Sequence, residues 1–228
     1  MSWIEKLYRT YENNLDNIGN PNDPTPLLPV SHTTQNAHVT IIIDSQGNFL
    51  RASVITKNDA KTIIPATEES AGRAGSKPAS FPLCDKLQYL AGDFVAFGGR
   101  VTSGFAAMPS EPHDNYLKLL AGWCESPHKH PKVCAVLAYV RRGKVVSDLV
   151  EAKVLHTGNG RLIAAWNGPV NETPEIFKVV PGGNGQSDAF VRFSVQCPGD
   201  PQSELWSDQT AWESWAAYYA SQKSQQGL

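Results

Sequence analysis

The sequence predicts an α+β fold with an antiparallel or mixed sheet, flanking helices and a long polar loop. Three observations predict it: several segments repeat apolar residues at helical spacing, others cluster β-branched residues, and residues 70–80 hold almost no large apolar side chain. The 228 residues, 41% of them hydrophobic, can bury a sizeable core. A chain of this length suits one large domain or two small ones, and we expect residues 1–228 to form a single domain.

The N-terminal segment predicts a helix over residues 2–14. Ser2 and Glu5 have the spacing of a capping box. Trp3, Leu7 and Tyr11 recur every four residues, which predicts one buried face. The following stretch, 20–29, contains four prolines and predicts an extended connector.

A β-hairpin is the clearest pattern in the chain. Residues 37–44 are rich in β-branched side chains, residues 45–48 predict a turn, and residues 49–56 continue with Val and Ile. Residues 57–64 lead from this hairpin to Pro65 and the polar loop, so we expect the loop to hang from a sheet. The segment 94–102 fits a strand or an irregular segment.

The second half of the chain alternates predicted helices and strands. Helical spacing returns over 111–124 and again after Pro131, where Gly143 indicates a helix end, although the valines of this second segment also allow a strand. Residues 145–155 are ambiguous. Residues 161–167 and 189–196 predict strands, and residues 182–185 a turn.

Aromatic residues mark a final helix. Trp212, Trp215 and Tyr219 lie at helical spacing, and Ser207 or Asp208 is placed to cap the helix start. Such an aromatic stripe is typical of a core.

The polar run from Ser70 to Ser80 is the main candidate site. It contains no acidic residue, and it combines glycines, which allow close backbone approach, with cations and hydroxyls that suit phosphates and base edges. The apolar residues 81–92 would tie this loop back to the body. The candidate contacts in the loop are Ser70, Gly72, Arg73, Gly75, Ser76 and Lys77. The alternative is an ordinary mobile surface loop.

The charge distribution permits a cationic face. The net charge is −2, which argues against a general nucleic-acid binder, but residues 51–150 carry 13 Lys and Arg against nine Asp and Glu. The four cysteines form no dense framework and fit a reducing cytoplasm. No apolar run reaches the length of a membrane span.

Two other chemistries have weak support in the sequence. Cys124, His128, His130 and Cys134 are all zinc-ligand types, but their spacing matches no usual zinc finger. His113 beside Asp114 is the nearest approach to a catalytic pair, and its position near Pro112 instead indicates a helix start. We therefore expect no metal, no cofactor and no catalysis. The basic run 141–144 fits either a helix C-terminus or phosphate contacts.

Several motifs carry a resemblance to a known family. They are T-E-E-S-A-G-R-A-G-S-K-P followed by F-P-L-C-D-K-L-Q-Y-L-A-G (67–92), L-Y-x-x-Y (7–11), I-I-I-D-x-x-G-x-F (41–49) and L-W-x-D (205–208). Together they resemble the N-terminal part of the large subunit of the type I-C CRISPR surveillance complex, Cascade. Members of that family are much longer, so the resemblance implies that this chain is an N-terminal domain from a longer protein.

The resemblance implies a function in antiviral defence. The large subunit recognises the protospacer-adjacent motif (PAM) in double-stranded DNA, helps to open the duplex for the guide RNA, and helps to recruit a helicase–nuclease without being the nuclease itself. On this basis Arg73 is expected to enter a groove or donate to base acceptors, Ser70 and Ser76 to donate to minor-groove atoms, and Lys77 to bind a phosphate. Lys86 and Arg100 are further phosphate candidates.

The alternative is a structural domain that docks to neighbouring Cascade subunits or to the helicase–nuclease, with DNA read elsewhere. With either function, we expect the chain to contact the guide RNA only indirectly, through the other subunits of the complex. The acidic flanks and the Trp-rich C-terminus suit protein contacts.

Overall fold

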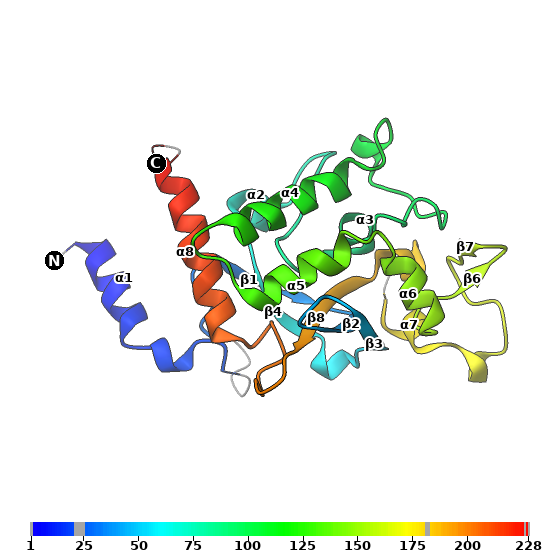
Figure 1. The fold of residues 1–228 in the computed structure, drawn as a ribbon, viewed down its shortest axis with the longest axis horizontal. Helices are drawn as coiled ribbons and strands as arrows, with labels where there is room; N and C mark the ends of the chain where they lie inside the picture. The colour runs from blue at the N-terminus through cyan, green and yellow to red at the C-terminus, as the bar shows by residue number, and fades with distance from the viewer. Residues whose placement is uncertain (1, 21–25, 181–182, 226, 228) are drawn as a thin grey trace.

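The computed structural model describes residues 2–20, 26–180, 183–225 and 227, and it has the expected α+β architecture (Figure 1). The connector predicted over 20–29 and the turn predicted over 182–185 lie partly outside the described residues. The helices are α1 (Trp3–Glu12), α2 (Glu68–Gly72), α3 (Leu87–Leu90), α4 (Glu111–Glu125), α5 (Pro131–Val140), α6 (Val145–Glu151), α7 (Glu175–Val179) and α8 (Gln209–Gln225). The strands are β1 (His32–Asn36), β2 (Val39–Asp44), β3 (Phe49–Val54), β4 (Lys61–Pro65), β5 (Asp85–Lys86), β6 (Thr157–Gly158), β7 (Arg161–Leu162) and β8 (Phe190–Gln196).

The main sheet is mixed and has the strand order β3-β2-β8-β5. The predicted hairpin forms as the antiparallel pair β2–β3, and its turn is held by Asp44, whose carboxylate accepts from the backbone N–H groups of Gln46 and Asn48, both at 2.8 Å. β2 pairs in parallel with β8, and β5 pairs with β8 in the antiparallel sense. A chain of sheet contacts therefore links the hairpin to the segment that follows the polar loop.

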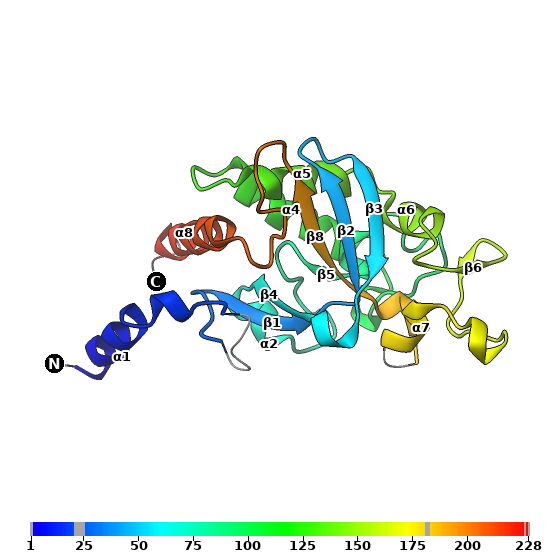
Figure 2. The ribbon, with the colours of Figure 1, turned by 90° about the horizontal axis from the view of Figure 1, so that it is seen from below.

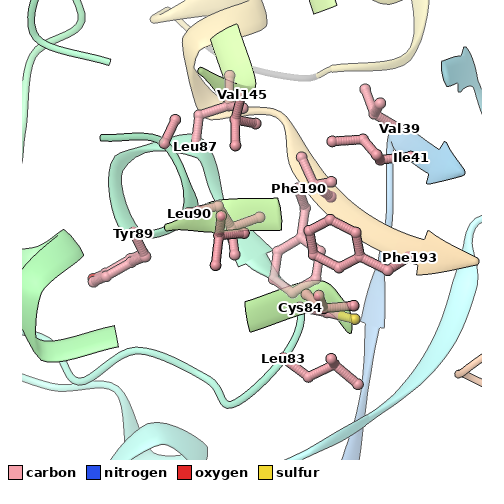
Figure 3. Packing of buried hydrophobic residues seen from close by; sticks show 14 of the residues in the cluster. Val39, Ile41, Leu83, Cys84, Leu87, Tyr89, Leu90, Val145, Phe190 and Phe193 are labelled. Atoms are coloured by element: carbon pink, nitrogen blue, oxygen red, sulfur yellow. The ribbon is translucent and has the colours of Figure 1, made fainter. Parts of the chain in front are cut away.

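The core lies where α5 packs on β2 and β8 of this sheet, and α4 in turn packs on α5 and α3 (Figure 2). Phe190 and Phe193 of β8 lie close to Leu83 and Cys84 at the end of the loop segment, with Ile41 of β2 beside them (Figure 3). Large apolar side chains that leave water together supply the main favourable free energy of folding. The polar loop is thus anchored at its C-terminal end by the centre of the core.

Arg192 shows how β8 also buries a charged side chain. It is 8% exposed, donates to the hydroxyl oxygens of Thr40 (3.0 Å) and Thr62 (3.2 Å) and to the Asp59 carbonyl (3.0 Å), and stacks on Trp206 at 3.7 Å. A buried guanidinium needs such partners because its desolvation is otherwise costly.

Two local expectations need correction, and one strand was not predicted. Strand β1, which no sequence pattern indicated, pairs with β4. The strand expected over 161–167 is reduced to Arg161–Leu162, held in a two-residue hairpin with β6. The face of α1 expected to be buried is exposed: Trp3, Ile4 and Tyr8 expose 74%, 70% and 61% of their surface, and both views show α1 standing away from the body.

The other helix predictions are confirmed. The capping box of Ser2 and Glu5 is present, and α5 ends before Gly143. For the segment 145–155 the sequence made no choice, and the structure contains α6 there. The aromatic stripe of α8 belongs to the core, where Trp215 packs edge-on against Trp123 of α4 with ring centroids 5.1 Å apart.

One ion-pair cluster fastens α8 to α5. The Lys132 ammonium lies 2.6 Å from Asp208 and 2.8 Å from Asp200 and also donates to the Gln202 carbonyl. Asp208 caps α8 by accepting from the N–H of Thr210 at 3.1 Å. Lys132 and Asp208 are both almost fully buried, so Asp208 depends on Lys132 for its charge partner, while Lys132 has the more exposed Asp200 as a second one.

We expect Asp208→Ala to lower the free energy of unfolding by roughly 3 kcal/mol or more, because it leaves the buried Lys132 short of a partner and removes a helix cap. Urea unfolding followed by circular dichroism measures it. Asp200→Ala is the matched control, since the Asp200 side chain is 41% exposed and its loss leaves the Lys132–Asp208 pair intact. Equal losses in both variants would contradict the assignment.

Candidate functional site

The first residues of the polar run serve a structural purpose. Thr67 and Ser70 form a capping box at the start of α2, in which the Thr67 N–H donates to the Ser70 hydroxyl at 2.8 Å. Ser70 is fully buried. The Ser70 hydroxyl, expected to donate to minor-groove atoms, therefore faces the protein rather than solvent.

Arg73 closes the loop on itself. Its guanidinium pairs with the buried carboxylate of Asp85, donates to the Ala79 carbonyl at 3.0 Å, and lies over the rings of Phe81 (4.1 Å) and Tyr89 (4.9 Å). Both the ion pair and the aromatic rings favour a planar guanidinium in this position. The structure thus places Arg73 at the base of the loop, whereas we expected it to enter a DNA groove or donate to base acceptors.

The Asp85 carboxylate that pairs with Arg73 is shielded from solvent. Its side chain is 0% exposed, and it also accepts from the Phe81 N–H at 2.7 Å. Burial raises the pKa of Asp85 to about 6, and the adjacent Arg73 charge and the backbone N–H donors act in the opposite direction.

The tip of the loop is small and exposed. Gly72, Ala74, Gly75 and Ser76 all face solvent, and a Cβ atom built on Gly72 or Gly75 would meet no atom within 4 Å. Gly75 has φ +84°, a backbone conformation that favours glycine. We call residues 74–77 the loop tip.

The far side of the loop tip rests on the segment that precedes α4. Lys77 lies 2.6 Å from Glu111 and 5.7 Å over the Phe105 ring, with half of its side chain still exposed. A Cβ atom on Gly104 would overlap the Ser76 carbonyl, so glycine at 104 allows the backbone to approach. The loop tip is therefore held at both ends while its middle is free of contacts.

The two remaining candidates, Lys86 and Arg100, meet in one cleft of about 710 Å³. Lys86 lies 3.1 Å from Asp188 across the cleft. One wall is fixed by Gln88, whose amide oxygen accepts from the Thr102 N–H at 2.9 Å. Segment 100–105 thus faces the cleft through Arg100 and Thr102 and supports the loop tip through Gly104 and Phe105.

Of the four predicted cations, only Arg100 makes no hydrogen bond or ion pair within the described part of the chain. Sequence reasoning missed a second such cation, Arg161. Its stem lies against Gly98 of the cleft, where a Cβ atom would sit 3.2 Å from it. The sequence signal that could have indicated this position is the preceding Asn159-Gly160 pair, which is typical of a tight hairpin turn. In the structure both residues have positive φ and form the β6–β7 turn.

The residues proposed above for a metal site or a catalytic pair do not come together as a site within the described part of the chain. Among the described residues, no group of three or more His, Cys, Asp and Glu side chains is placed to hold a metal ion. His130 faces Thr210, with Nε2 3.1 Å from its hydroxyl. His113 Nδ1 lies 2.8 Å from the Tyr89 carbonyl, and Arg142 of the basic run donates to Asn48 at 2.8 Å.

The family comparison covers all of these features. The model described as "CRISPR-associated protein (Cas_Csd1)" matches residues 7–228. The chain belongs to the Cas_Csd1 family. The CRISPR association implied by the sequence motifs is thereby confirmed for this chain. No curated protein matches it. In this Cas_Csd1 chain, none of the described helices has the length and hydropathy needed to cross a bilayer.

We expect Asp85→Asn to release Arg73, because a neutral amide cannot match the buried charge pair. Trypsin should then cut after Arg73 roughly tenfold faster than in the wild type, measured by mass spectrometry of the first fragments under native conditions. Asp114→Asn, which changes an exposed carboxylate on α4, is the control. Unchanged cleavage after Arg73 in Asp85→Asn would show that the aromatic rings alone hold the loop.

A second expectation concerns pH. Between about pH 4 and pH 6 the folded protein keeps a proton on Asp85 that the unfolded chain, with an Asp pKa of ~3.9, has released. The contribution of Asp85 to the free energy of unfolding therefore falls as pH rises through this window. The stability advantage of the wild type over Asp85→Asn should shrink by roughly 1–3 kcal/mol from pH 4.5 to pH 7 in urea titrations. An advantage that grows with pH would mean that Arg73 outweighs burial.

Proposed function

We propose that this Cas_Csd1 chain is the N-terminal part of the large subunit of a type I-C surveillance complex and that its loop tip contacts the PAM in double-stranded DNA. In such a complex the protein reads a short duplex motif, while guide-RNA pairing reads the remaining target sequence. The family match supports the CRISPR association, and the PAM role rests on the geometry of the loop.

The observation that carries the proposal is an exposed tip of small residues on a fixed base. The minor groove of B-DNA is only ~6 Å wide, so a glycine-containing tip enters it more easily than a bulky one. The Arg73–Asp85 pair holds the base of the loop before DNA arrives. A preformed loop loses less conformational entropy on binding than a mobile one.

Each predicted contact residue then takes a definite part. Ser76 at the tip donates to groove acceptors, and Gly72 and Gly75 allow the backbone to approach closely. Lys77 exchanges Glu111 for a phosphate, since this exposed ion pair is weak. Arg100 and Lys86 bind the backbone further along. Arg73 and Ser70 hold the loop in shape.

The chain would act without catalysis of its own. Its partners in this proposal are target DNA, the other Cascade subunits, the guide RNA through those subunits, and a separate helicase–nuclease that degrades the opened DNA in the cytoplasm.

A second candidate function is docking to a neighbouring subunit, with DNA read elsewhere. The exposed apolar face of α1 favours it, because Trp3, Ile4 and Leu7 leave a contiguous apolar strip in water. Steep salt dependence of DNA binding by this chain supports the first function, and its absence supports the second.

We expect Gly75→Ala to reduce discrimination between PAM-containing and scrambled duplexes by about tenfold in the assembled complex. The added methyl group meets open space within the protein and changes the approach to DNA, and alanine at φ +84° also carries a backbone strain of roughly 1–2 kcal/mol. Electrophoretic titration against a library randomised beside the target measures the discrimination.

Gly199→Ala is the matched control, since Gly199 has φ +80° and no atom within 4 Å of a built Cβ. Lys77→Ala should instead weaken all duplexes alike and reduce the salt slope by about one. Full discrimination in Gly75→Ala would place PAM reading outside the loop tip.

A further inference from the structure

A second surface lies beside the loop and has a different chemical character. The 710 Å³ cleft that holds Lys86 and Arg100 shares Ala164 with a shallow hollow of about 600 Å³ lined by Trp166. We propose that the cleft and hollow together bind an unpaired single strand of nucleic acid, with phosphates on Arg100 and Arg161 and a base stacked on Trp166.

Charge is the first support. The side chains of Arg100 and Arg161 make no hydrogen bond or ion pair to any described residue, and Lys86 faces the only acidic group among the described residues lining the cleft, Asp188. The hairpin that carries Arg161 is held at the cleft by the Leu162 N–H, which donates to the Phe97 carbonyl at 2.8 Å. Two uncompensated arginines at one cleft attract a chain of phosphates.

The aromatic platform is the second support. Trp166 is half-buried, with its ring centroid 6.5 Å from His156 and 6.4 Å from Phe177. Its indole N–H donates to the Pro169 carbonyl at 3.1 Å. The ring is therefore held in place before a base stacks on it, which reduces the entropy lost on binding.

The combination selects unpaired strands over duplexes. In a duplex each base face already lies on its neighbours, so a recessed indole cannot reach it. In a single strand the bases are free, and a cationic groove with an adjoining aromatic ring is the arrangement that binds such strands with little sequence preference. The phosphates are common to DNA and RNA, so both are included.

This inference goes beyond the proposed duplex contact: it shares the cleft residue Arg100 with that contact and adds Arg161 and Trp166, which the duplex proposal does not use. The loop tip consists of small, exposed residues, whereas Arg100 in the cleft, Arg161 against Gly98 and the ring of Trp166 lie outside the loop. If the PAM proposal is wrong, the loop-tip variants will discriminate between PAM-containing and scrambled duplexes as the wild type does. If this inference is wrong, the cleft variants will bind single strands as the wild type does.

The test is fluorescence anisotropy of the full chain with labelled 12-nucleotide oligo(dT), oligo(U) and a 12-base-pair duplex between 50 and 200 mM salt. Arg100→Ala combined with Arg161→Ala should lower single-strand affinity at least tenfold and reduce the salt slope by about 1.4, or ~0.7 for each lost phosphate contact. Arg51→Ala on edge strand β3, also an exposed arginine, should change affinity less than twofold.

Trp166→Ala should lower single-strand affinity about tenfold and leave duplex affinity unchanged, while Trp166→Phe should recover most of the loss because it keeps a ring. Thermal melting of each variant identifies unfolding. The inference is overturned if the wild type does not bind either single strand at 50 mM salt, if the double arginine variant binds within twofold of wild type, or if Arg51→Ala loses as much. A preference for oligo(dT) or oligo(U) identifies the strand type.

Discussion

The pair formed by Arg73 and the buried carboxylate of Asp85 is the constraint on which the functional surface depends. It joins the end of α2 to the start of β5, and β5 is itself paired with the central strand β8. The loop between them therefore has its two ends tied to the core even though its middle contains little that is apolar. If this pair were absent, the base of the loop would lose its charged contact with the core, and the loop tip would be held mainly by Lys77 and by the close approach of Ser76 to Gly104.

Much of the fold follows from local pattern, because hairpin turns, capping boxes and helical spacing act over a few residues. The β2–β3 hairpin, α4, α5 and the core position of α8 are of this kind. The pairing of β1 with β4 is not, since its polar sequence becomes a strand only through its partner. Arg73 was recognised as a site residue, but its contact with Asp85, twelve positions along the chain, has no local signature.

The same limit applies to the cleft. Lys86 and Arg100 could be recognised as cations from the sequence. Their shared cleft, and the position of Arg161 against Gly98, depend on long-range folding that brings the β6–β7 hairpin to this part of the chain. Spacing also failed for α1, whose periodic apolar residues correctly predict a helix but do not specify what the helix packs against. A hydrophobic stripe indicates a buried face only when a partner is available within the chain.

The exposed face of α1 has a consequence for how the chain would assemble. A ten-residue helix is marginal in water without tertiary contacts, and no residue of α1 is buried. Its helical population in the free chain rests on the capping box and a few side-chain pairs. A partner that covers the apolar face would therefore couple folding to association, giving an interface whose affinity is lowered by the ordering of the helix and whose lifetime can be tuned by changes at Ser2 that never touch the partner.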